Sequence, residues 1–234
     1  MRTVLVTGAS RGIGLELVKQ ESEAGSKVLA TCRDPEGATG LAGLAGQNPG
    51  NVFIHRMDVG SEMSVQTLAR TLLAKGESVD CLYNNAGIMD WRTMMEVDAS
   101  AMEEAYKVNV VGAMLVLRHF LPLLRQGGGK LVVNMSSRLG SIALRGKSKL
   151  GGSIAYSASK AGLNMLTKQA SIDLAGDEIS VVSISPGWVR TDMGGKDAKY
   201  SVEESVKAMM RNVRNLRMED SGKFFGENGG ELPW

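Results

Sequence analysis

A tyrosine and a lysine, Tyr156 and Lys160, stand four positions apart in the helical stretch Tyr156-Ser-Ala-Ser-Lys160. Residues at this spacing share one face of a helix, with Cβ atoms about 5 to 6 Å apart, so both can act on one bound molecule. A phenol with a pKa of about 10 needs about 4 kcal/mol of anion stabilisation to ionise at neutral pH. One ammonium about 4 Å away supplies energy of that order at an effective dielectric of about 20. The tyrosine is therefore a candidate general acid whose pKa the lysine lowers.

A general acid of this kind can protonate a carbonyl oxygen as a hydride reaches the carbon, if a second donor holds the oxygen. The run Asn134-Met-Ser136-Ser137 ends an expected strand and supplies two hydroxyl groups. Adjacent strand residues point to opposite faces, so only one of the two serines should face a substrate. These residues alone leave the choice open.

Hydride chemistry requires a nucleotide site, and a glycine-rich run, Thr7-Gly-Ala-Ser-Arg-Gly-Ile-Gly14, lies between the first expected strand and helix. Its three glycines allow a tight turn and close approach of the backbone to a diphosphate, while the N–H groups of the helix start favour the anion. The spacing differs from the familiar dinucleotide fingerprint, but the place in the chain is the one that the fingerprint requires.

The same turn contains Gly8-Ala-Ser10-Arg-Gly12, which fits the nucleophile elbow of α/β-hydrolases, with Ser10 as the nucleophile. A serine hydrolase also needs a histidine. The two histidines, His55 and His119, fall in an expected strand and inside an apolar helix, so this alternative is disfavoured.

The end of the second expected strand, Ala30-Thr-Cys32-Arg33-Asp34, bears on the choice of nucleotide. An acidic residue there binds the ribose 2′-hydroxyl of NAD, whereas a guanidinium accommodates the 2′-phosphate of NADP. If the strand ends at Cys32, Arg33 follows it and Arg11 adds a second cation, which favours NADP(H) over NAD(H). A strand one residue longer would instead aim Asp34 at the pocket.

Short β-branched runs alternate with longer helical segments, and this order predicts βαβ units on a parallel sheet. Right-handed crossovers then give one Rossmann-type, doubly wound α/β domain over residues 1–234, with about seven strands and helices on both faces. Its ligand crevice should lie at the carboxyl ends of the strands. Strands are expected at 3–7, 27–32, 51–57, 80–83, 130–135 and 179–184, and helices at 12–24, 62–74, 101–124, 155–174 and 201–215.

Composition narrows the protein classes. Apolar residues make up 43%, charged residues 22%, and the net charge is only +2, which is typical of a soluble globular protein. The densest basic run, at 145–149, is short and lacks aromatic residues, so nucleic-acid binding is not expected. Cys32 and Cys81 suit buried free thiols in a reducing compartment. No apolar stretch reaches bilayer length and no secretory pattern is present, so we expect a cytoplasmic protein without membrane or metal partners.

Together these motifs resemble the short-chain dehydrogenases/reductases of the compact, single-domain type. The resemblance covers nearly the whole chain in the family's order: the turn at 7–14, Asp58-Val59, Asn84-Asn85-Ala86-Gly87, Asn109 in its Lys-Val-Asn-Val-Val-Gly-Ala context, Ser137, the stretch at 156–160 and Pro186-Gly187-Trp188-Val189-Arg190-Thr191. More narrowly, the runs at 136–142, 185–195 and 221–234 are similar to the C-factor-like and sniffer-type carbonyl reductases.

The resemblance implies a role for each site residue. Ser137 orients the carbonyl and Tyr156 is the acid–base. Lys160 holds ribose hydroxyls and lowers the tyrosine pKa, and Asn109 interrupts its helix to hold a water that connects Lys160 to solvent. The implied cofactor-binding residues are Gly8, Ser10, Arg11, Gly12, Ile13, Gly14, Arg33, Asp58, Val59, Asn85, Ala86, Gly87, Tyr156, Lys160, Pro186, Gly187, Val189 and Thr191.

Within this set, Asp58 would touch the adenine, Asn85 the adenosine ribose, and Val189 and Thr191 the nicotinamide carboxamide. For Asp58 a second role is open, that of a cap for the helix starting at about Ser61, and both roles could hold.

The substrate side of the site is less defined by motifs. The segment 145–152 looks extended for a compact member of the family and is a candidate cover for the pocket mouth. The glycines and polar residues within 190–205 are typical of a substrate lid. An adaptable apolar pocket, or simple packing, would account for Trp188 and for Met89, Met94, Met95 and Met193.

Two functions are consistent with the sequence. One is an NADPH-dependent reductase of a small aldehyde or ketone substrate. The alternative is a nucleotide-binding, C-factor-like signalling or regulatory protein that acts through a partner. Apolar residues on more than one face of the helix at 155–174 favour a homodimer or tetramer.

Overall fold

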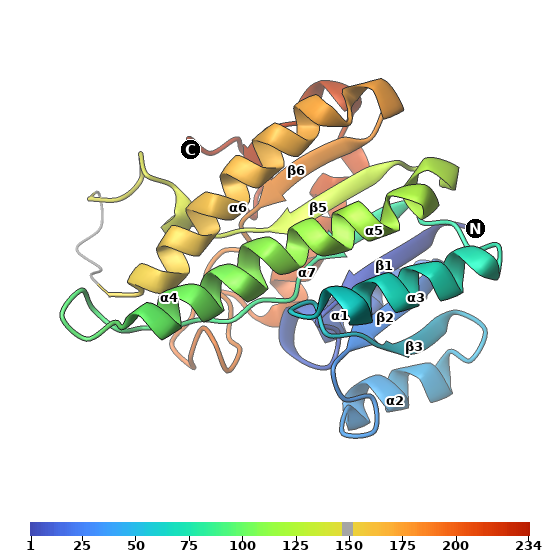
Figure 1. The fold of residues 1–234 in the computed structure, drawn as a ribbon. Coiled ribbons are helices and arrows are strands. Elements are labelled where there is room, and N and C mark those ends of the chain that lie inside the picture. Colours follow the sequence, from blue (N-terminus) through green and yellow to red (C-terminus); the bar gives the residue numbers. More distant parts are fainter. Residues whose placement is uncertain (147–151) are drawn as a thin grey trace.

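Seven parallel strands form one twisted sheet in the computed structural model of this chain, which describes residues 1–146 and 152–234 (Figure 1). The strand order is β3-β2-β1-β4-β5-β6-β7, so the chain reverses direction across the sheet between β1 and β4. Such a reversal opens a crevice at the carboxyl ends of the strands, where α/β proteins bind ligands. The strands are β1 Thr3–Thr7, β2 Lys27–Cys32, β3 Val52–Arg56, β4 Cys81–Asn84, β5 Leu131–Met135, β6 Ser180–Ile184 and β7 Phe224–Phe225.

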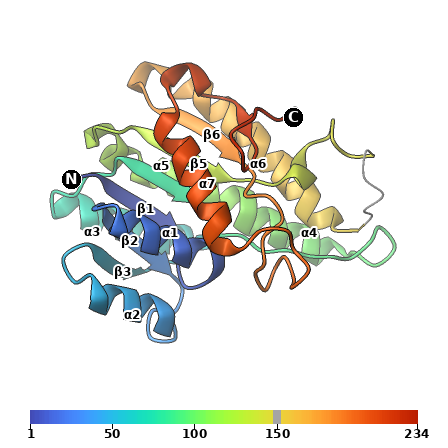
Figure 2. The ribbon, with the colours of Figure 1, turned by 180° about the vertical axis from the view of Figure 1, so that it is seen from behind.

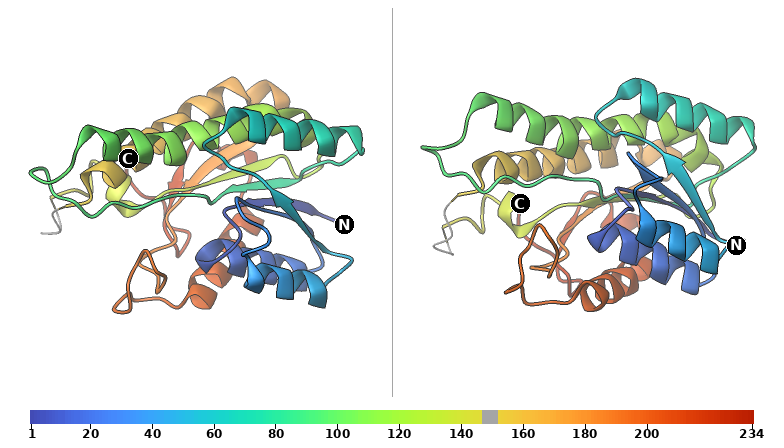
Figure 3. Two further views of the ribbon diagram at one scale, coloured as in Figure 1. Left: turned by 60° about the horizontal axis from the view of Figure 1, so that its bottom comes forward. Right: turned by 90° about the horizontal axis from the view of Figure 1, so that it is seen from below.

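Helices cover both faces of this sheet. One layer contains α3, α4, α5 and α6 (Figure 1), and the other contains α1, α2 and α7 (Figure 2). The two views of Figure 3 show the sheet between these layers. The helices are α1 Gly12–Glu23, α2 Thr39–Gln47, α3 Glu62–Ala74, α4 Ala99–Tyr106, α5 Gly112–Gln126, α6 Ile154–Asp173 and α7 Val202–Asn215.

The central strand β1 explains why the sheet needs two helical layers. Val4 and Val6 pack in the core beneath α1 and α7, whereas Leu5 between them packs with α3 and α5. All three are fully buried. Because adjacent strand residues point to opposite faces, an unbroken apolar strand is stable only when both faces are covered. The predicted doubly wound α/β fold is confirmed.

Three elements differ from the sequence-based expectation. Helix α2 was not predicted, because its sequence Thr-Gly-Leu-Ala-Gly-Leu-Ala-Gly-Gln has three glycines and a weak apolar stripe. The two-residue strand β7 is too short to give a periodic pattern. The long helix expected at 101–124 begins at Ala99 and is interrupted by a π-helical segment, η1 Lys107–Val111, that separates α4 from α5.

This interrupted helix, Ala99–Gln126, has the length and apolar composition of a membrane span, contrary to the expectation that no stretch would reach bilayer length. Its apolar residues are largely accounted for by the core, since Phe120, Leu123 and Leu124 are fully buried against the sheet. The two cysteines are free and buried, as predicted. Burial raises the pKa of the Cys81 thiol to about 12.

Candidate active site

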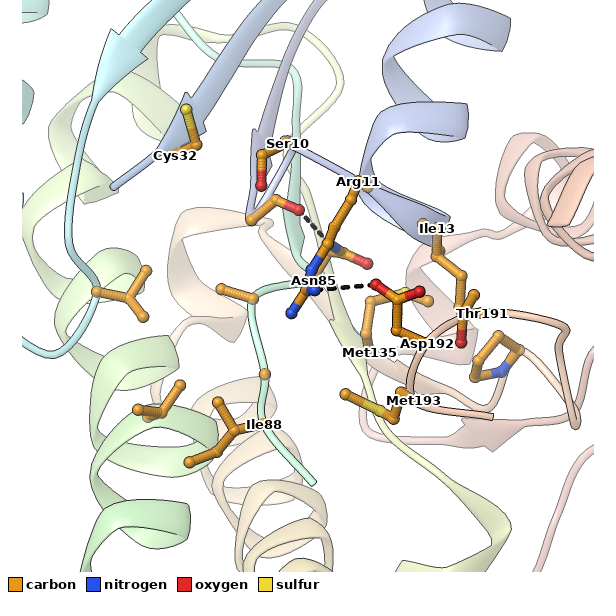
Figure 4. A pocket seen from close by; sticks show the side chains of 18 of the residues that line it. Ser10, Arg11, Ile13, Cys32, Asn85, Ile88, Met135, Thr191, Asp192 and Met193 are labelled. Atoms are coloured by element: carbon orange, nitrogen blue, oxygen red, sulfur yellow. Dashed lines mark hydrogen bonds and ion pairs between the residues drawn. The ribbon is translucent and has the colours of Figure 1, made fainter. Parts of the chain in front are cut away.

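The carboxyl ends of the strands on either side of the chain reversal border a cavity of about 470 Å³ (Figure 4). Its walls come from the glycine turn after β1, the ends of β2, β4 and β5, one face of α6 and the loop after β6. Of the predicted site residues, those that line it are Gly8, Ser10, Arg11, Gly12, Ile13, Gly14, Arg33, Asp58, Val59, Asn85, Ala86, Gly87, Tyr156, Lys160, Pro186 and Thr191.

The glycine turn is held against the end of β4 by a compact set of hydrogen bonds. The Thr7 hydroxyl accepts from the backbone N–H groups of Asn85 and Ala86, both at 3.0 Å. The Asn85 side-chain amide donates to the carbonyl of Thr7 at 2.8 Å. Gly8 has a φ of +66°, and a Cβ on Gly14 would lie 2.2 Å from the Gly8 carbonyl oxygen. Only glycine at these positions allows this turn.

The end of the cavity beside β2 carries the guanidinium of Arg33. Strand β2 ends at Cys32, as predicted, and Arg33 lines the cavity whereas Asp34 does not. Arg11 also lines it, and its guanidinium Nη1 lies 2.9 Å from Oδ2 of Asp192 (Figure 4). Both side chains of this pair are more than three-quarters exposed. No sequence motif indicates that Asp192 lies at this site, because Asp192 and its partner Arg11 are far apart in the sequence.

Asp58 occupies the cavity wall without capping a helix. Its Oδ1 accepts from the backbone N–H of Gly60 at 2.9 Å. The cap of α3 is Ser61, whose hydroxyl accepts from the N–H of Ser64. The suggestion that Asp58 caps this helix is therefore wrong, because the preceding turn places Ser61 at the position where the first free N–H groups point.

Tyr156 and Lys160 both line the cavity from the first half of α6, as their spacing predicts. The Lys160 Nζ lies 5.5 Å from the centroid of the Tyr156 ring and donates to the Met135 carbonyl at 2.7 Å. Both side chains are buried. The two residues and the end of β5 therefore form one wall.

The pKa values of this pair differ from the sequence-based expectation. Burial raises the pKa of Tyr156 to about 12, opposed by its hydrogen bond with Ser137, and lowers the pKa of Lys160 to about 8. The lysine was expected to lower the tyrosine pKa. That lowering is not seen: burial dominates, because desolvation disfavours the charged form of each group, and the contribution that opposes it at Tyr156 comes from Ser137. Tyr156 is thus a protonated hydroxyl at neutral pH.

The two serines after β5 have different environments. The Ser136 hydroxyl is buried and donates to Oδ1 of Asn164 at 2.6 Å. Ser137 instead lies beside Tyr156, whose pKa it lowers, and its Oγ accepts from the N–H of Leu139 at 3.2 Å. Of the two, Ser136 lines the cavity but its hydroxyl is already bound to Asn164, whereas Ser137 does not line the cavity and is the serine beside Tyr156.

Asn109 lies in η1, where the helix is interrupted, and is almost fully buried. Its amide donates to the Ile88 carbonyl and to the Ser159 hydroxyl, both at 2.9 Å, and its Oδ1 accepts from the Ile88 N–H at 2.8 Å. A Cβ on Gly87 would lie 3.1 Å from this Oδ1 and 3.5 Å from Lys160 Nζ. The asparagine thus fixes the loop after β4 beside the lysine.

Only some residues of the loop after β6 that were expected to bind the cofactor line the cavity. Gly187 and Val189 do not line the cavity; Val189 is buried and pairs with Tyr200 in a short bridge. The Trp188 indole is exposed and donates to the Gly194 carbonyl.

The expected apolar pocket also differs in its residues. Among the methionines expected there, Met193 lines the cavity, while Met94 and Met95 are among the most exposed apolar residues. Met57 and Met135, which end β-strand runs, line it instead. Of the expected pocket cover at 145–152, residues 147–151 lie outside the described part of the chain.

Comparison with solved structures places this site in a known context. The chain is similar to the NADPH-bound carbonyl reductase from chicken fatty liver, with 36% identity and a TM-score of 0.94 over 100% of this chain and 99% of the other. It is also similar to the carbonyl reductase Sniffer of D. melanogaster, with 33% identity and a TM-score of 0.92 over the full length of both chains.

Sequence comparison agrees. The C-signal protein of Myxococcus xanthus is 41% identical over 157 residues, which are 67% of this chain and 93% of that protein. The family model described as short chain dehydrogenase matches residues 2–201, most of the chain. The protein therefore belongs to the short-chain dehydrogenases, a family of oxidoreductases.

Proposed function

We propose that this protein uses NADPH to reduce an aldehyde or ketone to an alcohol, with Tyr156 as the general acid. The observation that carries the proposal is that Tyr156 and Lys160 line, from α6, the same cavity as the glycine turn, with Ser137 close enough to the tyrosine to lower its pKa. Two hydroxyls placed together at this position can hold one carbonyl oxygen. The NADPH-bound and carbonyl-reducing neighbours reported above support the same activity.

The residues of the cavity fit a dinucleotide. Gly12 opens α1 directly at the cavity, so backbone N–H groups of the first turn are available to a diphosphate. Arg33 supplies positive charge near the end of β2, where a 2′-phosphate would bind, and Lys160 is placed to hold ribose hydroxyls. When bound, NADPH supplies the hydride.

The protein's own groups then manage the proton. Ser137 and Tyr156 hold the carbonyl oxygen, and Tyr156 gives its proton to that oxygen as negative charge develops on it. Its raised pKa keeps the hydroxyl protonated throughout the neutral range, which suits the reductive direction. Lys160 remains positive below a pH of about 8 and stabilises the tyrosine anion that forms.

Replacing Arg33 should change the affinity for NADPH but not the affinity for NADH. We expect Arg33→Ala to weaken NADPH binding about tenfold, the loss of one charge-assisted hydrogen bond, and to leave NADH binding unchanged. Titration of intrinsic tryptophan fluorescence with each nucleotide measures both affinities. Asp34→Ala is the matched control. An equal loss for NADPH and NADH in Arg33→Ala would contradict the assignment of Arg33 to the 2′-phosphate.

The proposed activity is tested by following nicotinamide absorbance with NADPH and a panel of aldehydes, ketones and quinones. The second candidate, a nucleotide-binding signalling protein, is favoured by the 41% identity to the C-signal protein. Tight NADPH binding without turnover of any carbonyl in the panel would favour this candidate. Turnover that is lost with Tyr156 supports the reductase.

We also propose that residues 190–205 close over the substrate. The first part of this segment borders the cavity through Thr191, Asp192 and Met193, and its last four residues form the first turn of α7. The intervening chain is fixed at Arg190, whose backbone N–H donates to the Tyr200 carbonyl at 2.9 Å. Movement would therefore be confined to the loop between these two points.

A homodimer through α6 stays a prediction. Met165 and Ile172 on this helix are exposed, at 68% and 60%, so an apolar strip is open to a second copy. Sedimentation at micromolar protein should give the mass of two chains, and Met165→Lys should shift it to one. A wild-type mass of a single chain would overturn the prediction.

A further inference from the structure

The last part of the chain folds back onto the turn that carries Ser137. Beyond β7, residues 226–230 form a turn closed by a hydrogen bond from the Gly226 N–H to the Gly230 carbonyl. In both views of Figure 3 the C-terminal end lies beside the segment that follows β5. The Ser141 hydroxyl donates to the carbonyl of Pro233 at 2.6 Å. This tail lies outside residues 2–201, which the family model matches.

Glu227, in this tail, contacts three separate segments around the candidate active site. Its Oε2 lies 3.1 Å from the Nη2 of Arg138, the residue directly after Ser137. Its Oε1 accepts from the Tyr200 hydroxyl at 3.3 Å. Its Cδ would lie 3.3 Å from a Cβ on Gly187, so the carboxylate also abuts the turn after β6. The Glu227 side chain is only 15% exposed.

These contacts join the turns that follow β5 and β6, just outside the residues that line the cavity. Arg138 is further fixed because its N–H donates to the Ser185 hydroxyl at 3.3 Å. The same hydroxyl accepts from the N–H of Gly187 at 3.4 Å. The turn after β5 and the turn after β6 are thus joined twice, once through Ser185 beneath them and once through Glu227 from the tail. The partly buried Glu227 carboxylate is held in place by Arg138 and Tyr200, because moving it away from them would leave a desolvated charge.

We propose that Glu227 is a positioning residue for carbonyl reduction, an inference that rests on the proposed function. Its carboxylate holds the Arg138 turn, and therefore Ser137, at a fixed distance from Tyr156 and from the loop that ends at Tyr200. Catalysis is sensitive to such placement, and a shift of about 1 Å can cost roughly a hundredfold in rate. Glu227 itself does not line the cavity.

The test compares Glu227→Gln with Glu231→Gln, an exposed carboxylate in the same tail. We expect Glu227→Gln to lower kcat/KM for a carbonyl substrate about tenfold, mainly through kcat, with the Kd for NADPH unchanged. Arg138→Gln should give a similar loss. The double variant should be no worse than either single one, because both remove the same contact. Tyr200→Phe should give a smaller loss of the same kind.

Three outcomes would overturn the proposal. One is that Glu227→Gln has the same kcat/KM as Glu231→Gln. Another is that the losses of kcat/KM from Glu227→Gln and Arg138→Gln are additive in the double variant. The third is that NADPH affinity and melting temperature fall in proportion to kcat/KM, as a merely structural role would require. If Glu227→Gln does not fold, Arg138→Gln tests the contact from its more exposed side. A wild-type protein that turns over no carbonyl would instead contradict the proposed function, and the positioning role with it.

Discussion

Tyr156→Phe should reduce NADPH-dependent carbonyl reduction by roughly 100- to 10,000-fold, the usual contribution of a positioned general acid. Phenylalanine keeps the aromatic ring on α6 and removes only the hydroxyl, which lies beside Ser137. The Kd for NADPH should change little, because the other residues of the cavity wall remain. Steady-state rates with one aldehyde and one ketone, together with a nucleotide titration, measure both quantities.

The matched control is Tyr106→Phe, at a half-exposed tyrosine on α4. It should retain wild-type rates. Retention of most of the activity by Tyr156→Phe would show that another group protonates the carbonyl oxygen. A parallel loss of nucleotide binding would mean that the hydroxyl supports the fold of the cavity rather than proton transfer.

Lys160→Met should abolish most activity and at the same time stabilise the nucleotide-free protein. The loss of activity follows from the role proposed for the Lys160 ammonium, which is to stabilise the tyrosine anion and hold the ribose. The gain in stability follows from burial, which lowers the Lys160 pKa from 10.5 to about 8. A shift of that size corresponds to about 3 kcal/mol of cost for keeping the charged amine in the native state. Loss of the hydrogen bond to the Met135 carbonyl offsets about 1 kcal/mol of the gain.

This stability effect has a defined pH dependence. Below a pH of about 8 the lysine is protonated in both the folded and the unfolded state, so the cost is fully present. Between about 8 and 10.5 the unfolded state binds more protons, and the stability of the wild type rises with pH. Lys160→Met lacks this rise, so its gain in stability over the wild type should shrink as the pH rises through that range.

Denaturant unfolding of the nucleotide-free proteins at pH values across this window measures the effect. Lys168→Met, on the same helix, is the control. A Lys160→Met variant that is less stable than the wild type at pH 7 would contradict the assignment of Lys160 as a buried cation.

Much of the fold could be predicted because strand positions carry strong local signals. The bounds of β1 and β2 were predicted to the residue, and the other long strands to within one residue at each end. Their apolar runs are continuous because both faces are buried. Helix α2 gave no such signal. Its glycines weaken helix propensity, and packing of Leu41 beside α1 decides its conformation instead.

The candidate site could be predicted where local motifs mark it, and less well where distant contacts decide it. The glycine turn and the stretch around Tyr156 each lie within a few residues of sequence, and both line the cavity. The contacts of Asp192 and Glu227 join residues far apart in the chain, and no local pattern reports them. The raised pKa of Tyr156 was missed for a related reason, since residue spacing does not reveal how deeply a hydroxyl is buried.

A crystal structure of the protein with bound NADPH tests the central claim most directly. The account predicts that the nicotinamide ring lies beside the Tyr156 hydroxyl, with Lys160 on the ribose and Ser137 across the space left for a carbonyl. It also predicts Arg33 at the 2′-phosphate. A nicotinamide ring that binds outside this cavity, or a Tyr156 hydroxyl turned away from the ring, would contradict it.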